Sequence, residues 1–254
     1  MGVGYTLGCL VSILWWSFDR KKVFGLVDKL LCKIFKLKAL RYAFYTCLMF
    51  FIIWIMVKFK SYEIANFITA FLVIDISRSE KENIESKEMK FHKTIAVVCK
   101  SLVCGFTAPL FYILIFGNYF ALTYFILYNL CMLSDYEGFE IILKILTIIP
   151  GLILQFVLYL IYIFTSKKYS MDFKGDYLIN CFKRPLLNIE IMAAHIESVG
   201  FYYHFYEEDT SYIKIYGHQK GSIDEKAVKH YLGVIYSAAF IMFLSFISIY
   251  VVSR

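Results

Sequence analysis

The sequence predicts an all-α polytopic membrane protein with about five or six membrane helices and a small α+β extramembrane segment before the last helix. Of its 254 residues, 60% are hydrophobic and only 19% are charged, whereas soluble domains are roughly 45–50% apolar. The apolar residues are gathered into six long runs, at 2–17, 43–57, 94–116, 119–134, 141–164 and 232–252. This composition excludes an ordinary soluble globule.

The length of each run indicates how it meets the bilayer. A spanning helix needs about 20 mostly apolar residues, because its backbone polar groups must bond internally in hydrocarbon. The runs 94–116, 141–164 and 232–252 satisfy this requirement directly. The other three are shorter, and we expect them to be tilted, shallow or paired as legs of a hairpin. Gly117-Asn118 predicts a tight joint between the third and fourth runs.

Residues 18–42 carry most of the net charge of +7, with eight Lys/Arg against Asp19 and Asp28. An excess of this kind favours the cytoplasmic side of a membrane. Apolar residues recur in it at helical spacing: Val23, Val27, Leu30, Ile34 and Leu37. Lys29, Lys33 and Lys36 share the opposite side. We therefore expect a basic amphipathic helix on an anionic lipid surface, with the lipid membrane as a partner and no nucleic acid.

We expect residues 1–254 to form a single integral membrane domain, within which the polar region 165–231 is long enough for a small extramembrane subdomain. This region holds nine Lys/Arg, nine Asp/Glu and four of the five histidines. Ile189 to Val199 is typical of a short helix that ends at Gly200. The β-prone runs Phe201 to Tyr206 and Tyr212 to Tyr216, around a polar turn, predict a hairpin.

Charges and prolines inside the apolar runs are the first indication of a site. Lys100 and Lys144 lie within two of the runs, where a charge usually faces a cavity, a partner or the interface, and Glu140 is placed to pair with Lys144 at i,i+4. Pro109 and Pro150 can open the hydrogen-bond ladder of a membrane helix. We expect a cytoplasm-facing cavity formed by the helices within 94–164 and roofed by 165–231. Histidine and cysteine spacing indicates neither a zinc site nor a disulfide framework.

Several blocks in the second half resemble a known family. They are the stretch from Gly105 to Gly117 (GFTAPLFYILIFG), Ala121-Leu-Thr-Tyr124, Ile149-Pro150, Asn188, Met192-Ala-Ala194 and Gly200. In order and spacing they resemble the adenosylcobinamide-phosphate synthases, integral membrane proteins of cobalamin biosynthesis. The resemblance covers about residues 94–254, and the basic segment near 18–42 resembles a basic segment of the family more weakly. It implies a location in the cytoplasmic membrane of a bacterium or archaeon.

The resemblance also implies an activity, which is ATP-dependent amide formation between the corrinoid adenosylcobyric acid and aminopropanol or its phosphate. The implied cofactors are ATP and Mg²⁺, and other membrane proteins of cobalamin synthesis are implied partners. The acidic motif of the family falls on Lys100-Ser-Leu-Val-Cys104, where every acid is replaced. The remaining polar residues supply the candidate catalytic residues Asp135, Glu137, Glu140 and Asn188. Asn129, Lys100 and Lys144 are the candidate substrate-binding residues, and no metal ligand set is assigned.

Three interpretations stay open at this point. The first is a divergent amide ligase of the cobalamin pathway that has relocated its polar groups. The second is a catalytically inactive relative that serves as a membrane scaffold or partner, or binds a corrinoid or another amphipathic ligand. A small transporter is less favoured, because no inverted repeat and no matching pair of broken helices is evident in the sequence.

Overall fold

The computed structural model confirms the predicted fold class. It describes residues 2–58, 62–77, 91–133, 137–167, 169–196, 201–207, 210–217 and 225–252. Within these ranges, four helices are long and apolar enough to cross a membrane: Lys38–Ile55, Ala96–Phe116, Gly138–Thr165 and Lys229–Val252. Three shorter apolar helices accompany them, at Val3–Leu14, Glu63–Val73 and Leu187–Ile196. The chain is therefore an all-α polytopic membrane protein with one small two-stranded sheet.

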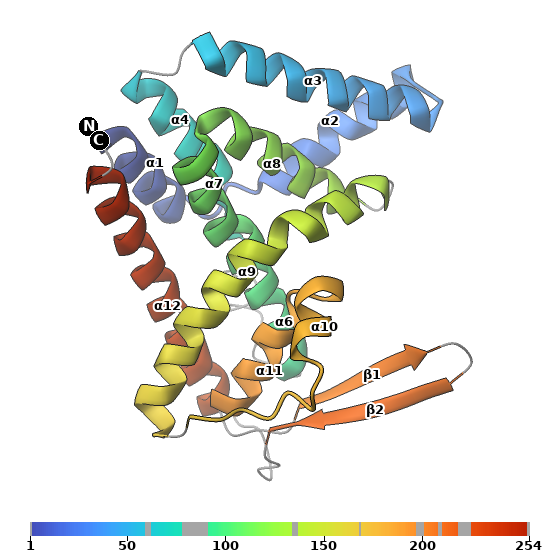
Figure 1. Ribbon diagram of the computed structural model, residues 1–254. Coiled ribbons are helices and arrows are strands. Elements are labelled where there is room, and N and C mark those ends of the chain that lie inside the picture. Colours follow the sequence, from blue (N-terminus) through green and yellow to red (C-terminus); the bar gives the residue numbers. More distant parts are fainter. Residues whose placement is uncertain are drawn as a thin grey trace.

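The first third of the chain forms one end of the molecule. Its helices are α1 (Val3–Leu14), α2 (Arg20–Ile34), α3 (Lys38–Lys58) and α4 (Glu63–Val73). The β-hairpin projects from the opposite end, and the diagonal helix α9 (Glu137–Ser166) runs between the two ends (Figure 1). The chain termini lie side by side, since the rings of Tyr5 and Tyr250 on the last helix are 5.0 Å apart (Figure 1).

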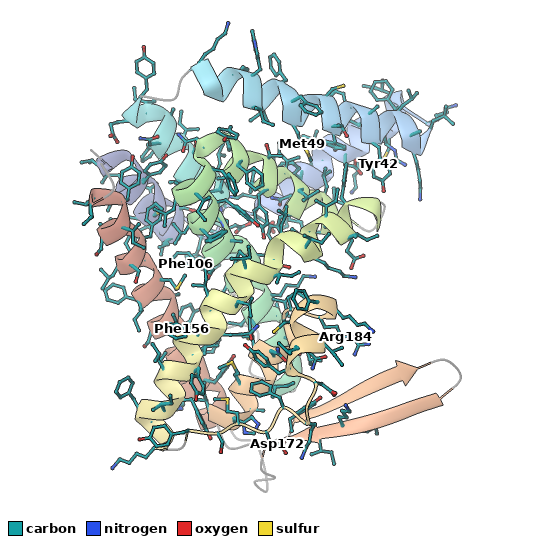
Figure 2. All side chains as sticks on the ribbon, in the orientation of Figure 1. Tyr42, Met49, Phe106, Phe156, Asp172 and Arg184 are labelled. Atoms are coloured by element: carbon teal, nitrogen blue, oxygen red, sulfur yellow. The ribbon has the colours of Figure 1, made fainter. Side chains whose placement is uncertain are left out.

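Helix α3 is the most exposed of the four candidate spans, with only 11% of its apolar window buried. It contacts the rest of the protein along one side, where Tyr42 packs against the ring of Phe139 at 4.9 Å and Met49 joins the apolar core (Figure 2). Its outer face presents large apolar side chains such as Phe50 and Trp54. A helix with so much exposed apolar surface is stable only where lipid or another protein surrounds it.

Helix α2 has three faces. Phe24 and Leu31 pack inward, with Arg20 and Asp28 buried beside them. The apolar residues of the predicted amphipathic segment 18–42 instead lie on the surface, with exposures of 43–69%: Val23, Val27, Leu30, Ile34 and Leu37. The lysines at 29, 33 and 36 are exposed as well. The predicted apolar face is thus free to contact lipid, and a separate face, which the sequence analysis did not distinguish, holds the helix to the protein.

Glycines allow α1 and α4 to approach each other closely. A Cβ atom added at Gly4 would lie 2.3 Å from the Glu63 carbonyl oxygen, and one added at Gly8 would lie 2.5 Å from the Phe67 carbonyl oxygen. Small residues four apart are the usual means of close helix packing in membranes. The short helix α4 was absent from the predicted apolar runs, although the sequence from Glu63 to Val73 is strongly apolar.

The predicted run 94–116 is one helical rod with a widened turn in its middle. Helix α6 (Phe91–Leu102) leads into a π-helical turn (Val103–Thr107), and α7 (Ala108–Phe116) continues the rod. Gly117 then adopts φ 84°, which allows the predicted tight joint, and α8 (Asn118–Cys131) follows at once. Single π-helical turns inside α-helices are frequent at functional sites.

Two prolines account for unusual hydrogen bonds in these helices. Proline has no N–H, so the carbonyl four residues earlier loses its helical partner. For Pro109 this is the carbonyl of Gly105, which accepts instead from the backbone N–H of Asp75 at 2.8 Å. For Pro150 it is the carbonyl of Leu146, which accepts from the hydroxyl of Tyr112 at 2.6 Å. Each carbonyl that the proline leaves without a helical partner thus forms a hydrogen bond with a residue from another helix or loop.

The segment before the last helix contains the predicted helix and hairpin. It comprises α10 (Tyr177–Lys183), α11 (Leu187–Ile196), β1 (Phe201–Glu207) and β2 (Thr210–Tyr216). The strands are antiparallel, with Phe201 opposite Tyr216 and Glu207 opposite Thr210, so the hairpin prediction is confirmed. The predicted end of the helix, at residues 197–200, lies outside the described residues. Helix α12 (Glu225–Val252) then completes the chain.

Candidate functional site

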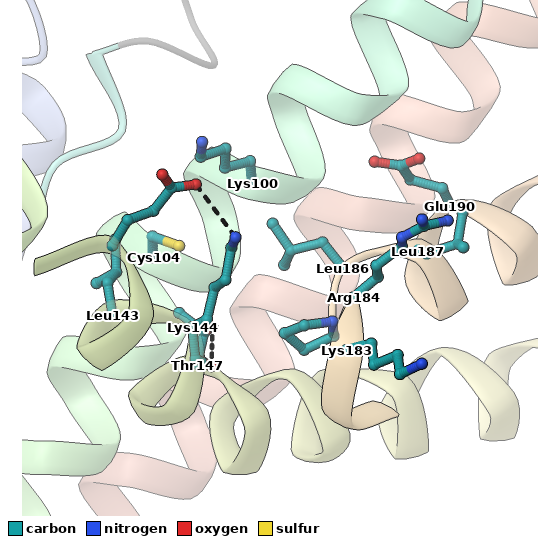
Figure 3. Close-up of a pocket in the computed structure, with 12 residues that line it drawn as sticks. Lys100, Cys104, Leu143, Lys144, Thr147, Lys183, Arg184, Leu186, Leu187 and Glu190 are labelled. Carbon is teal, nitrogen blue, oxygen red and sulfur yellow. Dashed lines mark hydrogen bonds and ion pairs between the residues drawn. The ribbon is translucent and has the colours of Figure 1, made fainter. Parts of the chain in front are cut away.

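A pocket of about 320 Å³ lies where three parts of the chain meet. One wall comes from α6 and the π-helical turn, a second from the first turns of α9, and the third from the loop that joins α10 to α11. We call it the basic pocket, because four cationic side chains line it: Lys100, Lys144, Lys183 and Arg184. Its position agrees with the predicted cavity between the 94–164 helices and the 165–231 segment (Figure 3).

The local sequence explains how each cation reaches the pocket. Lys100 stands in the last turn of α6, just before the π-helical turn. Lys144 is about two turns into α9 and forms the predicted i,i+4 ion pair with Glu140, with 3.4 Å between its Nζ and the carboxylate (Figure 3). Both side chains of this pair are 55% exposed, so water screens it and it is weak. The Lys144 ammonium is therefore available to a ligand at little cost.

The third wall depends on a short loop. Lys183 is in the last turn of α10, and Pro185 separates Arg184 from the start of α11. The carbonyl of Pro185 accepts a hydrogen bond from Gln155 Nε2 at 3.3 Å, which fixes the loop to α9. Three segments far apart in the sequence thus each contribute cationic residues to the lining of one pocket.

Glu190 adds a second carboxylate to the pocket, from the first turn of α11. Burial raises the pKa of Glu190 to about 7, because the charged form loses hydration there. The basic pocket therefore holds four cations and two carboxylates, one of which changes charge near neutral pH. Such a balance favours an anionic ligand, such as a carboxylate or phosphate ester.

The predicted site residues divide into three groups. Lys100, Lys144 and Glu140 come together in the basic pocket. Asp135 lies outside the described residues, and for Glu137 the structure describes only the backbone, at the start of α9. The remaining two, Asn129 and Asn188, lie elsewhere.

Asn188 is fully buried and holds α10 against α11. Its Nδ2 donates to the Tyr177 carbonyl at 3.0 Å and contacts Cys181 Sγ at 3.2 Å. It does not line the basic pocket, although Leu187 and Glu190 beside it do. The described contacts thus give Asn188 a structural position, and its predicted catalytic role stays a prediction.

Asn129 lines a second, smaller pocket of about 210 Å³ at the end of α8. Asp19, Lys21 and Asp75 are among the other residues that line it. The Asn129 side chain is 1% exposed, and its Nδ2 donates to the Phe125 carbonyl at 2.9 Å. The structure therefore separates this candidate substrate-binding residue from Lys100 and Lys144.

Beside this second pocket, Arg20 and Asp75 form a buried ion pair. Arg20 Nη1 is 3.5 Å from the Asp75 carboxylate, and their side chains are 2% and 10% exposed. Arg20 also donates to Ser12 Oγ at 2.6 Å and to the Phe71 carbonyl at 2.5 Å. The pair joins α1, α2 and the end of α4, and the Asp75 backbone in turn contacts Gly105 in the π-helical turn.

The sequence analysis did not single out Lys183, Arg184 and Glu190, which lie in the polar region 165–231. Lys183-Arg184-Pro185 is two adjacent cations before a proline, and this pattern does not indicate which part of the fold they line. Comparisons of the chain with protein-family models, with curated proteins and with solved structures found no match. The fold and the site thus define the chain as a polytopic membrane protein with a basic pocket between its membrane helices and its polar segment.

Proposed function

We propose that the chain is a membrane protein of corrinoid metabolism, and that its basic pocket binds an anionic group of an amphipathic substrate. The observation that carries the proposal is that Lys100, Lys144, Lys183 and Arg184, from three segments, all line one pocket. The sequence resemblance to the adenosylcobinamide-phosphate synthases supplies the substrate class, which is a corrinoid carboxylate. The cytoplasmic membrane of a bacterium or archaeon is the proposed location.

The first form of this proposal is ATP-dependent amide formation. Activation of a carboxylate by ATP places several phosphate oxygens in the site, and Lys and Arg side chains neutralise that charge. Mg²⁺ commonly binds through one or two carboxylates together with phosphate oxygens, and Glu140 and Glu190 are the described carboxylates in the pocket. The ion would offset charge on the transferred phosphoryl group. The cations hold the phosphates, and the loop at Pro185 positions two of these cations.

A second form is a relative that binds the corrinoid, or another amphipathic anion, without catalysis. It is favoured by Lys100, which stands where the resemblance places an acidic motif and which lines the pocket with an ammonium group. A cation at this position attracts an anion and repels Mg²⁺. In this form the protein serves as a membrane partner or scaffold for other proteins of cobalamin synthesis.

Binding and turnover assays on the purified, detergent-solubilised protein test both forms. Adenosylcobyric acid and aminopropanol are added with and without Mg-ATP, and the amide product is followed by mass spectrometry. ATP-dependent product supports the ligase, and saturable binding without product supports the non-catalytic relative. Absence of both binding and product contradicts the proposal.

A matched pair of variants ties the result to the pocket. Lys183→Met removes a cation from the basic pocket, whereas Lys29→Met removes an exposed cation from the outer surface of α2. We expect the first variant alone to weaken corrinoid binding, by roughly three- to tenfold. Equal effects of the two variants would show that the corrinoid does not bind in the basic pocket.

A further inference from the structure

A third pocket, of about 310 Å³, lies further along α9 and differs in character from the basic pocket. Its walls are mostly aromatic: Phe156 and Tyr159 come from α9, and Phe173 and Tyr177 come from the segment that leads into α10. Phe173 and Tyr177 meet edge to face, with their ring centroids 4.9 Å apart. We call it the aromatic pocket. Of the described residues that line it, none carries a formal charge at neutral pH.

Besides the two tyrosines, Gln155 on α9 is the polar residue that lines this aromatic pocket. It is 2% exposed, and its Nε2 donates to the Pro185 carbonyl at 3.3 Å. Because a carbonyl can only accept, this bond fixes the orientation of the amide and leaves Oε1 as an acceptor. Within the described part of the chain, Gln155 Oε1 is buried and has no hydrogen-bond partner. A buried acceptor of this kind costs free energy until a donor reaches it.

The entrance of the aromatic pocket is apolar. Leu152 and Phe156 are 36% and 62% exposed, and both belong to the candidate membrane span of α9. At the inner end, Met192 of α11 is only 2% exposed. An apolar molecule dissolved in the membrane therefore meets an apolar entrance, aromatic walls and, in Gln155 Oε1, a buried acceptor that has no partner among the described residues.

From this arrangement we infer that the aromatic pocket is a binding site for an uncharged aromatic ring that carries one N–H or O–H donor and enters from the bilayer. The ring packs between the two aromatic pairs, and its donor bonds to Gln155 Oε1. The inference is independent of the corrinoid proposal, because none of the aromatic walls belongs to the basic pocket. Both pockets draw residues from α9, α10 and α11, and the Gln155–Pro185 bond lies between them, but no residue lines both.

A matched pair of small probes isolates the hydrogen bond. Indole has an N–H donor, whereas 1-methylindole has the same ring without one. Ligand-observed NMR on the full chain in detergent, with protein-free micelles as the partition reference, gives the affinity of each. We expect indole to bind roughly five- to tenfold more tightly than 1-methylindole. Equal affinities would overturn the inference.

Two variants localise the effect. Gln155→Met keeps the length of the side chain and removes the acceptor, so the preference for indole should disappear while 1-methylindole still binds. Leu152→Trp fills the entrance from an exposed position, so both probes should be lost. Leu160→Trp adds the same ring at another exposed position of α9, outside the pocket, and should leave both affinities unchanged. A preference for indole that persists in Gln155→Met would also overturn the inference.

Competition experiments identify the source of the ring. In nanodiscs, α-tocopherol offers a phenolic O–H from within the bilayer, and adenosine offers an exocyclic N–H from the water. We expect α-tocopherol to displace indole and adenosine to leave it bound, because the exposed residues of the entrance are apolar. Displacement by adenosine alone would overturn entry from the membrane.

Discussion

The buried pair Arg20–Asp75 and the exposed pair Lys144–Glu140 have the same chemistry and opposite surroundings. Their ions are 3.5 Å and 3.4 Å apart, but the first pair is at most 10% exposed and the second is 55% exposed on both sides. Arg20 is further held by Ser12 and Phe71, so its charge is committed to the fold. Lys144 keeps most of its hydration and can exchange Glu140 for a ligand. Burial, more than separation, distinguishes a structural ion pair from one that can serve a site.

The largest expected effect follows from breaking the buried pair. Arg20→Met leaves the Asp75 carboxylate buried without its cation and removes the hydrogen bonds to Ser12 and Phe71. We expect a loss of about 3–5 kcal/mol in the free energy of unfolding, measured by denaturation in detergent. Lys22→Met is the matched control, because that lysine is 80% exposed and 3.8 Å from Asp19. A loss below about 1 kcal/mol for Arg20→Met would show that the pair is not structural.

A somewhat smaller loss of stability is expected at Gly105, where the π-helical turn contacts the backbone of Asp75. In Gly105→Ala, the new Cβ atom would lie 2.2 Å from the Asp75 carbonyl oxygen, so the backbone has to shift. Strain of this kind costs about 1–3 kcal/mol, which thermal unfolding can measure. In Gly233→Ala the new Cβ meets no atom within 4 Å, and we expect no loss of stability. Equal stability of the two variants would contradict the close packing of Gly105.

Substitution of an exposed cation of the basic pocket should change ligand affinity and leave the free energy of unfolding unchanged. Lys100→Met removes a cation from the basic pocket, so we expect the affinity for inorganic pyrophosphate to fall by roughly three- to tenfold, with an unchanged unfolding midpoint. Isothermal titration calorimetry at low salt measures the affinity, and Lys29→Met on α2 is the control. An unaltered affinity in Lys100→Met would mean that Lys100 is only an interfacial cation.

The smallest effect concerns Glu190, whose pKa is raised to about 7 by burial. Between the usual glutamate pKa of about 4.3 and pH 7, Glu190 is protonated in the folded protein and ionised in the unfolded chain. The free energy of unfolding should therefore fall as the pH rises toward 7, where the folded protein also loses this proton. We expect a decrease of about 1 kcal/mol between about pH 6 and about pH 8, most of it below about pH 7. Glu190→Gln should remove this slope, and Gly233→Ala should keep it. An identical slope in Glu190→Gln and the wild type would refute the assignment.

Local patterns in the sequence were sufficient for part of the fold. Hydropathy located three of the four long spans, and β-prone residues around a polar turn located the hairpin from Phe201 to Tyr216. The run 43–57 was predicted to be short, but the helix begins earlier, at Lys38, because its first turns include the charged residues Lys38 and Arg41 that an apolar run leaves out. The π-helical turn could not be located in this way, because it depends on Asp75 reaching the free carbonyl of Gly105 from 30 residues away. The pairing of α1 with α4 could not be predicted either. It depends on the small size of Gly4 and Gly8, and a hydropathy profile carries no information on side-chain size.

The candidate site was predictable only where a charge interrupted an apolar run. Lys100 and Lys144 were found for that reason, and Glu140 through its spacing from Lys144. Arg184 and Glu190 lie in a region that is polar throughout, so their positions in the pocket emerge only from the packing of α11 against α9 and α6. Asn188 was singled out by the family-like block around it; its side chain is buried and donates to the Tyr177 carbonyl, and its catalytic role stays a prediction.

The adjacent termini make the orientation of this protein accessible to a single measurement. Tyr250 packs on Tyr5, so residues near the two ends lie on the same side of the bilayer. A reporter enzyme that is active in only one compartment should therefore give the same reading whether it is fused before α1 or after α12. That reading identifies the compartment in which both ends lie. Together with the arrangement of the helices, it also identifies the side of the membrane to which the basic pocket is nearer. Cysteine pairs introduced at the two ends would cross-link in native membranes, which would check the arrangement without any fusion.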